Sequence, residues 1–326
     1  MRVLVTGATG FTGGHLARAL GARGLVVRAL VRAPERARAL AEAGIELAAG
    51  DLRDSASLRA AVRDVEVVYH VAALYREAGL PEREYFAVNA VAVGMIVEAA
   101  AAAGATRVVH CSTVGVHGDV ERPPADEDAP LRPGDVYQRS KVEGEAVARA
   151  AAVRTGIEVV IARPTGIYGP GDRRLLKLFR GVARRRFLLL GRGDVFYHLT
   201  YIDDLVEGFR RCGETPGVGG RTYILAGGEV TTLAELIQLI AGEAGVPPPR
   251  LRLPVWPFWV AGALCEVACA PLGIAPPLYR RRVDFFTKSR AFDIGRARRE
   301  IGFAPQVDVR DGIRRTLAWY REQGWV

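Results

Sequence analysis

The chain has 326 residues, of which 49% are hydrophobic and 25% are charged, and it carries a formal net charge of +9. This is ordinary globular usage, and the length allows a large buried core, with one large domain and a smaller lobe. The positive charge comes with no recognisable nucleic-acid-binding module, so we expect attraction for anionic ligands and no nucleic-acid partner.

The cysteines and the N-terminal segment bear on the compartment. The four cysteines show no zinc-type pairing with histidines, so we predict no metal site, and a reducing environment fits. No basic segment followed by an apolar one precedes the first predicted strand, so we expect no signal peptide. Both observations favour a cytoplasmic location.

A short β-rich run at residues 2–6 leads directly into a glycine-rich turn. Gly7, Gly10 and Gly13 have the spacing G-x-x-G-x-x-G, and a helical pattern follows. Glycines there allow a tight turn, a close backbone approach to a pyrophosphate and close packing of helix on strand. The helix N-terminus adds free N–H groups and a positive dipole end. We therefore predict a dinucleotide site, and a purely structural glycine turn is the alternative.

The first half of the chain alternates between β-rich and helical patterns. This alternation indicates βαβ units and a parallel sheet, which is an α/β fold of the doubly wound Rossmann type. We expect a dinucleotide-binding Rossmann domain at 1–165 and a mainly substrate-binding lobe at 166–326, from which some segments return to the Rossmann core. Strands are expected at 2–6, 25–31, 45–48, 65–70, 107–112 and 157–162, and helices at about 13–22, 34–43, 55–62, 83–103, 136–155, 175–186, 232–244 and 312–323.

The end of the second predicted strand bears on the choice of cofactor. An acidic residue at this place usually bonds the ribose 2′-hydroxyl of NAD, whereas this chain has Val31 and Arg32. A guanidinium can pair with the 2′-phosphate of NADP through charge-assisted hydrogen bonds, and Arg36 is expected to add to it. We therefore favour NADP(H), with NAD(H) possible, and a merely solvated Arg32 is the alternative interpretation.

Hydroxyl side chains stand at the end of the strand expected at 107–112. Ser112 and Thr113 occupy its carboxyl end, where ligands bind in open α/β sheets. A hydroxyl at Thr113 could hydrogen-bond a substrate carbonyl. Taken alone, the two residues are better explained as ordinary strand-end and turn positions.

Tyr137 follows Thr113 by 24 residues and is itself followed by Lys141 at the i, i+4 spacing. Residues at this spacing share one face of a helix, so both can reach one reacting group. A tyrosine hydroxyl has a pKa of about 10 and transfers protons poorly at neutral pH, but a neighbouring ammonium lowers that pKa. The pair therefore predicts a site of proton transfer, although the spacing alone also occurs by chance on solvated helices.

Together these features resemble the extended short-chain dehydrogenase/reductase superfamily over nearly the whole chain. The resemblance implies a catalytic set of Thr113, Tyr137 and Lys141, with Asn89 as a weaker candidate for helix geometry or a water relay. Relatives often dimerise through the helices that carry Asn89 and Tyr137, so we expect a homodimer. The cofactor contacts that the resemblance implies come from Gly7, Thr9, Gly10, Phe11, Gly13, Arg32, Asp51, Leu52, Ala72, Tyr137, Lys141 and Pro164.

Nucleotide-sugar epimerases and dehydratases form one branch that the chain resembles. They usually carry an arginine that holds a substrate phosphate where this chain has Tyr197, and often an asparagine where it has Gly166. Both departures remove polar contacts to a diphosphate. Arg192 or the arginines at 280–282 could compensate, so an epimerase or dehydratase with tightly bound NAD stays the alternative.

The other branch contains dihydroflavonol reductases, 3β-hydroxysteroid and sterol dehydrogenases and hopanoid-associated relatives. The chain resembles it at residues 163–172, 253–259, 276–279, 282 and 291–293. We therefore expect an NADP(H)-preferring oxidoreductase that interconverts a secondary alcohol and a ketone on a bulky, apolar small molecule. A non-catalytic dinucleotide sensor is a third hypothesis, which the complete catalytic set disfavours.

An apolar segment at residues 255–270 contains Glu266 as its only charged residue. It is too short and too interrupted by prolines for a membrane span. We expect it to pack over a hydrophobic substrate pocket, with Trp256, Phe258 and Trp259 lining or covering that pocket, and plain core positions are the alternative. Weak contact with a membrane surface is a further possibility.

Overall fold

Seven strands form one sheet in the part of the chain that the structure describes. The computed structural model describes residues 1–326 except 78, 270, 272–273, 275–276 and 278–279. All neighbouring strands are parallel, and the central ones are Val-rich and buried on both faces, as parallel strands between two helix layers require. Their order is β11 (Thr222–Leu225), β6 (Glu158–Pro164), β5 (Arg107–Cys111), β4 (Val67–His70), β1 (Arg2–Thr6), β2 (Val26–Val31) and β3 (Glu46–Ala49).

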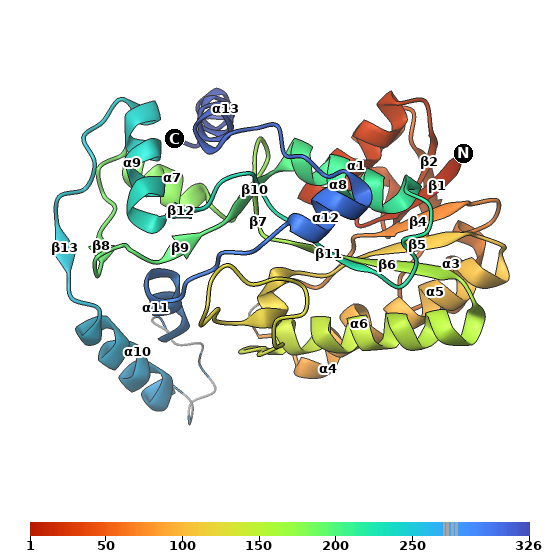
Figure 1. Cartoon of the computed structure of the whole chain (residues 1–326), viewed down its shortest axis with the longest axis horizontal. Helices are drawn as coiled ribbons and strands as arrows, with labels where there is room; N and C mark the ends of the chain where they lie inside the picture. Colours follow the sequence, from red (N-terminus) through yellow and green to blue (C-terminus); the bar gives the residue numbers. More distant parts are fainter. Residues whose placement is uncertain (78, 270, 272–273, 275–276, 278–279) are drawn as a thin grey trace.

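Helices cover both faces of this sheet (Figure 1). On one face lie α1 (Phe11–Ala22) and α8 (Ile202–Glu214), and on the other lie α3 (Ser55–Ala61), α5 (Ala92–Ala102) and α6 (Val136–Thr155). Two apolar clusters fill the layers between helices and sheet. Val3 and Val5 belong to one cluster and Leu4 to the other, because successive side chains of a strand point to opposite faces. The expected doubly wound α/β fold is confirmed.

The strand order reverses at β1, which has β2 on one side and β4 on the other. In open α/β sheets, ligands bind in the crevice at the carboxyl ends of the strands beside such a reversal. The glycine turn follows β1 directly, and Thr113 follows β5. The fold therefore brings the two predicted parts of the site to the same edge of the sheet.

The elements predicted for the first half agree with the structure, with two differences in detail. The six strands are confirmed within two residues at each end. The helix predicted at 83–103 is a continuous helical stretch made of α4 (Glu82–Phe86), a π-helical turn (Ala87–Val91) and α5. The helix predicted at 34–43 is a 3₁₀ turn (Pro34–Arg36) followed by the short α2 (Arg38–Ala41).

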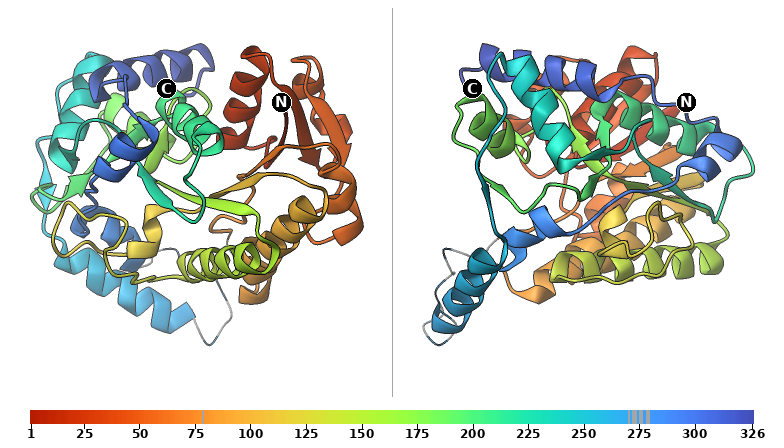
Figure 2. Two further views of the ribbon diagram at one scale, coloured as in Figure 1. Left: turned by 45° about the vertical axis from the view of Figure 1, so that its right-hand side comes forward. Right: turned by 60° about the vertical axis from the view of Figure 1, so that its left-hand side comes forward.

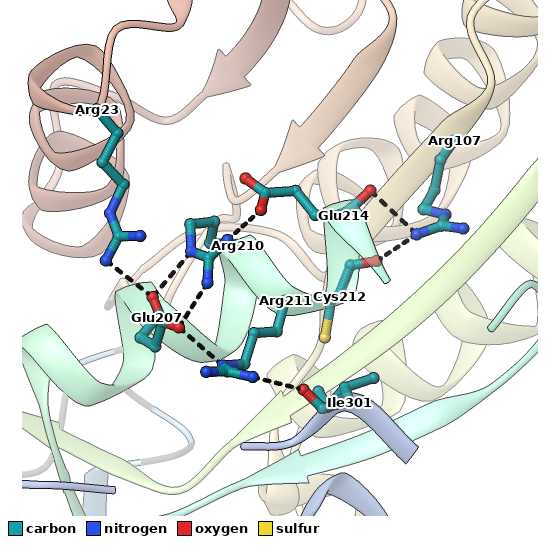
Figure 3. A network of polar contacts seen from close by, with 9 residues as sticks. Arg23, Arg107, Glu207, Arg210, Arg211, Cys212, Glu214 and Ile301 are labelled. Atoms are coloured by element: carbon teal, nitrogen blue, oxygen red, sulfur yellow. Dashed lines mark hydrogen bonds and ion pairs between the residues drawn. The ribbon is translucent and has the colours of Figure 1, made fainter. Parts of the chain in front are cut away.

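α8 and β11 are absent from the sequence prediction, although both belong to the sheet layers. Polar contacts between distant segments hold α8 in place (Figure 3). Glu207 accepts hydrogen bonds from Arg23, at the end of α1 (3.1 Å), and from Arg211 (2.7 Å). Arg107 of β5 donates to the carbonyl oxygen of Cys212 near the helix C-terminus (3.1 Å), across 105 residues of sequence. Such contacts leave no trace in local periodicity.

The other segments form the C-terminal lobe. α7 (Leu176–Ala183), α9 (Leu233–Ala244) and α13 (Val309–Glu322) pack together, and α12 (Gly295–Ile301) returns to β11. α10 (Trp256–Cys269) and α11 (Arg280–Thr287) pack on each other, and α10 projects from the body of the protein (Figure 2). The division of the chain at residue 165 stays a prediction. Short strands pair β7 (Gly166–Tyr168) with β10 (Leu199–Tyr201), β9 (Phe196–Tyr197) with β12 (Thr231–Thr232), and β8 (Leu189–Leu190) with β13 (Arg252–Leu253).

Candidate active site

The glycine turn has the geometry that a dinucleotide pyrophosphate needs. Gly7 has a φ of +72°, where a side chain is strained, and a Cβ on Gly13 would lie 2.3 Å from the carbonyl oxygen of Gly7. Glycines therefore allow β1 and α1 to approach this closely. α1 begins at Phe11, and its first backbone N–H groups and positive dipole end suit a pyrophosphate. The residues present fit a dinucleotide.

One cavity of about 1040 Å³ runs from the glycine turn, across the carboxyl ends of the strands, into the C-terminal lobe. The fold thus brings together residues that are scattered over more than half of the chain, and their individual roles stay predictions. The walls include Gly7, Thr9, Gly10, Phe11, Gly13, Arg32, Asp51, Leu52, Ala72, Thr113, Tyr137, Lys141 and Pro164, whereas the two further candidates, Arg36 and Asn89, are not among the described lining residues.

Tyr137 lies in the first turn of α6. Asp135 caps this helix by accepting a hydrogen bond from the backbone N–H of Gln138 (2.8 Å). Burial raises the pKa of Tyr137, whereas the guanidinium groups of Arg76 and Arg174 lower it. Arg76 lies over the Tyr137 ring, 5.5 Å from its centroid. The sequence analysis identified neither arginine, because both come from segments distant in sequence from Tyr137.

Lys141 lies one helical turn after Tyr137. Its ammonium donates to the carbonyl oxygen of Cys111 at the end of β5 (2.6 Å), and burial lowers the pKa of Lys141. Thr113 accepts a hydrogen bond from the backbone N–H of Gly115 (3.0 Å), which fixes the start of a 3₁₀ turn. Backbone contacts thus position both side chains. The expected lowering of the Tyr137 pKa is not borne out, because burial outweighs the neighbouring cations and holds the pKa above its ordinary value.

Asn89 occupies the π-helical turn and connects a loop to α6, the helix that carries Tyr137. Its side-chain oxygen accepts from the backbone N–H of Leu74 (2.8 Å), and its amide donates to the hydroxyl of Ser140 (2.9 Å). That hydroxyl donates in turn to the carbonyl oxygen of Tyr137 (2.8 Å). Asn89 is not among the described residues that line the cavity. These contacts support a role in helix geometry.

A buried ion pair lies behind the predicted catalytic residues. Glu145 of α6 and Arg163 of β6 are each 4% exposed and are joined by two hydrogen bonds, of 2.9 and 2.6 Å. Ser112, which precedes Thr113, donates its hydroxyl to Glu145 (2.5 Å). The pair therefore links α6 to the ends of β5 and β6, and it sets the position of Thr113 relative to α6.

Charged side chains line the cavity near the end of β2. Arg32 is exposed there, and Asp51 accepts a hydrogen bond from Nε of Arg53 (3.1 Å). Arg53 lines the cavity and was missing from the sequence prediction. Arg36 lies outside the set of described lining residues, so its expected contribution finds no support. The 3₁₀ turn that carries Arg36 lies beyond the cavity wall.

The far end of the cavity lies in the C-terminal lobe. Tyr197, Leu199, Phe285 and Phe292 form apolar wall there, and Arg290 adds a cation. The hydroxyl of Tyr197 donates to the carbonyl oxygen of Phe285 (2.6 Å), so its hydrogen atom is already engaged. The sequence analysis connected residues 291–293 with a known branch but did not place them in the pocket.

The prediction that three aromatic residues line or cover the lobe end of the cavity is wrong. Trp256, Phe258 and Trp259 belong to α10, and none is among the described residues of the cavity wall. The apolar run forms a helix that projects from the lobe instead of covering the pocket (Figure 2). Phe285 and Phe292, from later segments, line the pocket in their place.

The arginines expected to compensate for a missing phosphate contact lie elsewhere, as far as the structure describes them. Arg192 pairs with Asp194 (3.2 Å) and Arg280 with Glu266 (2.7 Å), and neither is found in the described cavity wall. The side chains at 281 and 282 lie outside the described part of the structure. Arg174 and Arg290 do line the cavity.

Comparison with known proteins agrees with this geometry. Residues 3–226 match the NAD dependent epimerase/dehydratase family. The chain is 33% identical to sterol demethylase protein B of Methylococcus capsulatus, over the full length of both proteins. The crystal structure of gox2253 matches with a TM-score of 0.85 and 30% identity over 99% of each chain. DesIV, a dTDP-glucose 4,6-dehydratase of Streptomyces venezuelae with NAD and TYD bound, matches with a TM-score of 0.79 and 28% identity over 100% of this chain and 98% of DesIV.

Proposed function

Because this chain belongs to the NAD dependent epimerase/dehydratase family, we propose that it is an NAD(P)-dependent oxidoreductase of the extended short-chain type that interconverts a secondary alcohol and a ketone on a bulky, apolar substrate. The observation that carries the proposal is the single cavity in which Thr113, Tyr137 and Lys141 stand between the glycine turn and an apolar lobe. One end suits a dinucleotide and the other suits an apolar small molecule.

Several residues around Tyr137 each contribute one part of the proposed reaction. A bound nicotinamide supplies or accepts the hydride. In the reductive direction, the Tyr137 hydroxyl donates its proton to the carbonyl oxygen of the substrate, and the Thr113 hydroxyl donates a hydrogen bond that polarises the same carbonyl. The positive charges of Lys141 and Arg76 favour the phenolate that remains. In the oxidative direction, the phenolate takes the proton of the substrate hydroxyl.

Two positions in the lobe support an apolar substrate. A Cβ added at Gly166 would lie 2.7 Å from Cδ2 of Leu199, so the asparagine found in nucleotide-sugar enzymes would displace that leucine. Tyr197 stands where those enzymes carry an arginine, and its hydroxyl is engaged by Phe285. Burial of apolar substrate surface contributes about 25 cal/mol per Å². Similarity to a protein named sterol demethylase protein B supports a sterol-like molecule.

A nucleotide-sugar epimerase or dehydratase with tightly bound NAD is the second candidate. Arg174 and Arg290 line the cavity and could pair with a diphosphate. Arg174 is held by Asp172 (3.0 Å), which makes Arg290 the sharper test of this candidate. The similarity to DesIV, which has NAD and TYD bound, favours the same reading.

Ligand binding separates the two candidates. We expect native mass spectrometry of the purified protein to show no retained NAD. We also expect NADPH oxidation with a steroid-like or flavonoid-like ketone and no binding of UDP-glucose, because the lobe presents more apolar wall than paired cations. Arg290→Ala is expected to keep most of the ketone reduction. Retained NAD, together with micromolar UDP-glucose binding that Arg290→Ala abolishes, would instead establish the second candidate.

The preference for NADP(H) over NAD(H) is a proposal that rests on Arg32. Arg32→Ala is expected to weaken NADPH binding by about 1.5–3 kcal/mol, or roughly 10- to 150-fold, because a charge-assisted contact to the 2′-phosphate is lost. NADH binding is expected to change little. Arg36→Ala is the matched control, since Arg36 is exposed but outside the described cavity wall. Fluorescence titration of both cofactors measures this, and equal losses for NADPH and NADH would show that Arg32 does not bind the phosphate.

Homodimerisation and a cytoplasmic location also stay proposals. Val91 belongs to the same π-helical turn as Asn89, and Val153 lies on α6. The side chains of both valines are exposed. Exposed apolar side chains on these two helices support the expected dimer through them.

A further inference from the structure

α10 leaves most of its apolar surface uncovered. The exposed fractions are 70% for Trp256, 65% for Leu264 and 73% for Val267, and Trp259 and Val260 are exposed as well. All fourteen residues of the helix are described, and only Gly262 is buried. A helix that is apolar all round is normally buried in protein or in a membrane, and contiguous exposed apolar surface marks an interaction site. In the part of the chain that the structure describes, this exposed apolar surface marks α10 as a candidate interaction site.

The helix is placed where it can reach a flat surface. It projects from the body of the protein, away from the sheet and from the helices that cover the sheet (Figure 2). Its contacts within the protein are mainly with α11. Two further apolar side chains, Leu251 before the helix and Ile274 after it, are more than half exposed.

The described carboxylates of α10 and α11, Glu266 and Asp284, are paired with cations, and the other described charges next to α10 are positive. Glu266 is the only ionisable residue with a carboxylate in the helix, and the guanidinium of Arg280 neutralises it (2.7 Å). Arg250 and Arg252 are exposed just before the helix, and the whole chain carries a net charge of +9. A bilayer surface with anionic headgroups complements an apolar strip with a cationic rim. A second copy of this chain would bring equal cationic rims together, which disfavours it as the occupant.

The length of α10 decides how it would meet a bilayer. Fourteen residues at about 1.5 Å each give a helix of about 21 Å, shorter than the hydrocarbon core of about 30 Å. The helical stretch Glu82–Ala102 is long and apolar enough to cross a membrane, but half of its most apolar part is buried inside the protein. Lying in the interface plane is the arrangement that remains for α10, with tryptophans at the headgroup level.

We propose that α10 docks the enzyme on an anionic bilayer surface and orients the lobe end of the cavity toward the lipid. α11, which packs on α10, carries Phe285 in the cavity wall, so the docking helix and the substrate pocket are one contact apart. An apolar substrate dissolved in the bilayer then has a short path to Tyr137. This second part rests on the proposed function, whereas docking itself does not.

Flotation of the full chain with vesicles tests the docking. We expect binding to vesicles that contain phosphatidylserine, weaker binding to pure phosphatidylcholine vesicles, and weakening by salt. Leu264→Glu with Val267→Glu is expected to reduce vesicle binding by roughly 10-fold or more, because burial of each apolar side chain in the bilayer contributes to the free energy of binding. Val26→Glu with Val230→Glu makes the same charge change at exposed valines elsewhere and is expected to keep vesicle binding.

Other outcomes would overturn the proposal. Wild-type protein that floats with neither vesicle, or equal binding by the two double variants, removes α10 as the docking helix. A wild-type dimer that Leu264→Glu with Val267→Glu converts to monomer, without vesicle binding, makes a second copy the occupant. Reduction of a water-soluble ketone by the α10 variant is expected to stay at the wild-type level. Vesicle binding does not require turnover, so the docking result can be interpreted even if the protein lacks the proposed activity.

Discussion

Replacing Tyr137 with phenylalanine is expected to lower turnover by about 10²–10⁴-fold while the fold and the NADPH affinity stay unchanged. The phenyl ring keeps its edge contact with Tyr75, whose ring centroid lies 4.9 Å away, but it has no proton to transfer. Burial raises the pKa of Tyr137, so the hydroxyl is protonated at neutral pH and ready to donate. The measurement is kcat and kcat/KM for reduction of an accepted ketone, together with a fluorescence titration of NADPH.

Tyr223→Phe is the matched control for this experiment. Tyr223 lies on β11, its hydroxyl donates to Glu300 (2.8 Å), and it is not among the described residues that line the cavity. Its loss is expected to leave kcat unchanged. Near-normal turnover in Tyr137→Phe would remove Tyr137 from its proposed role, and loss of NADPH binding in that variant would assign its hydroxyl to cofactor binding instead.

Replacing Glu145 with glutamine is expected to lower the free energy of unfolding by about 3–5 kcal/mol. The substitution leaves the guanidinium of Arg163 buried without a counter-charge, and an unpaired buried charge is costly. Glu143→Gln is the matched control, because Glu143 is exposed on the same helix and its change is expected to stay within about 0.5 kcal/mol. Urea unfolding of both variants at neutral pH measures the difference.

A double variant separates the charge of this pair from its positioning role. Glu145→Leu with Arg163→Met leaves no buried charge unpaired, so most of the lost stability is expected to return. Ser112 still loses its acceptor, so kcat is expected to stay reduced while NADPH affinity is kept. Wild-type stability in Glu145→Gln would show that the pair is not needed for the fold, and wild-type kcat in the double variant would show that it does not position Thr113.

The pH of the unfolding experiment follows from the pKa of Glu145. Burial raises this pKa, but the hydrogen bonds and the charge of Arg163, together with the hydrogen bond from Ser112 and the charge of Arg149, outweigh burial and hold it below the ordinary value of 4.5. A carboxylate with a lowered folded-state pKa contributes its full stability above the unfolded value and loses it as the pH falls through the folded value. Measurements at neutral pH therefore report the whole contribution of the pair.

Local patterns were sufficient to predict the Rossmann core and the glycine turn, and the family resemblance added the other residues that line the cofactor half of the cavity. A side chain at Gly13 is excluded by a contact within one turn, because its Cβ would lie 2.3 Å from the carbonyl oxygen of Gly7. Tyr137 and Lys141 share a helix face because the helix repeat places them there. Thr113 follows directly from the end of a strand. Each of these features depends on residues that are close in sequence.

Only the tertiary structure decided which side chains complete the site and what the apolar segment at 255–270 does. Arg76 reaches Tyr137, and Arg290 and Phe285 enter the cavity, through contacts between segments far apart in the chain. The same holds for Glu145 and Arg163, which look like two ordinary charges in sequence and form a buried pair in the fold. An apolar run such as α10 specifies a helix, but its burial depends on what packs against it, because covering surface comes from other elements and not from the run itself.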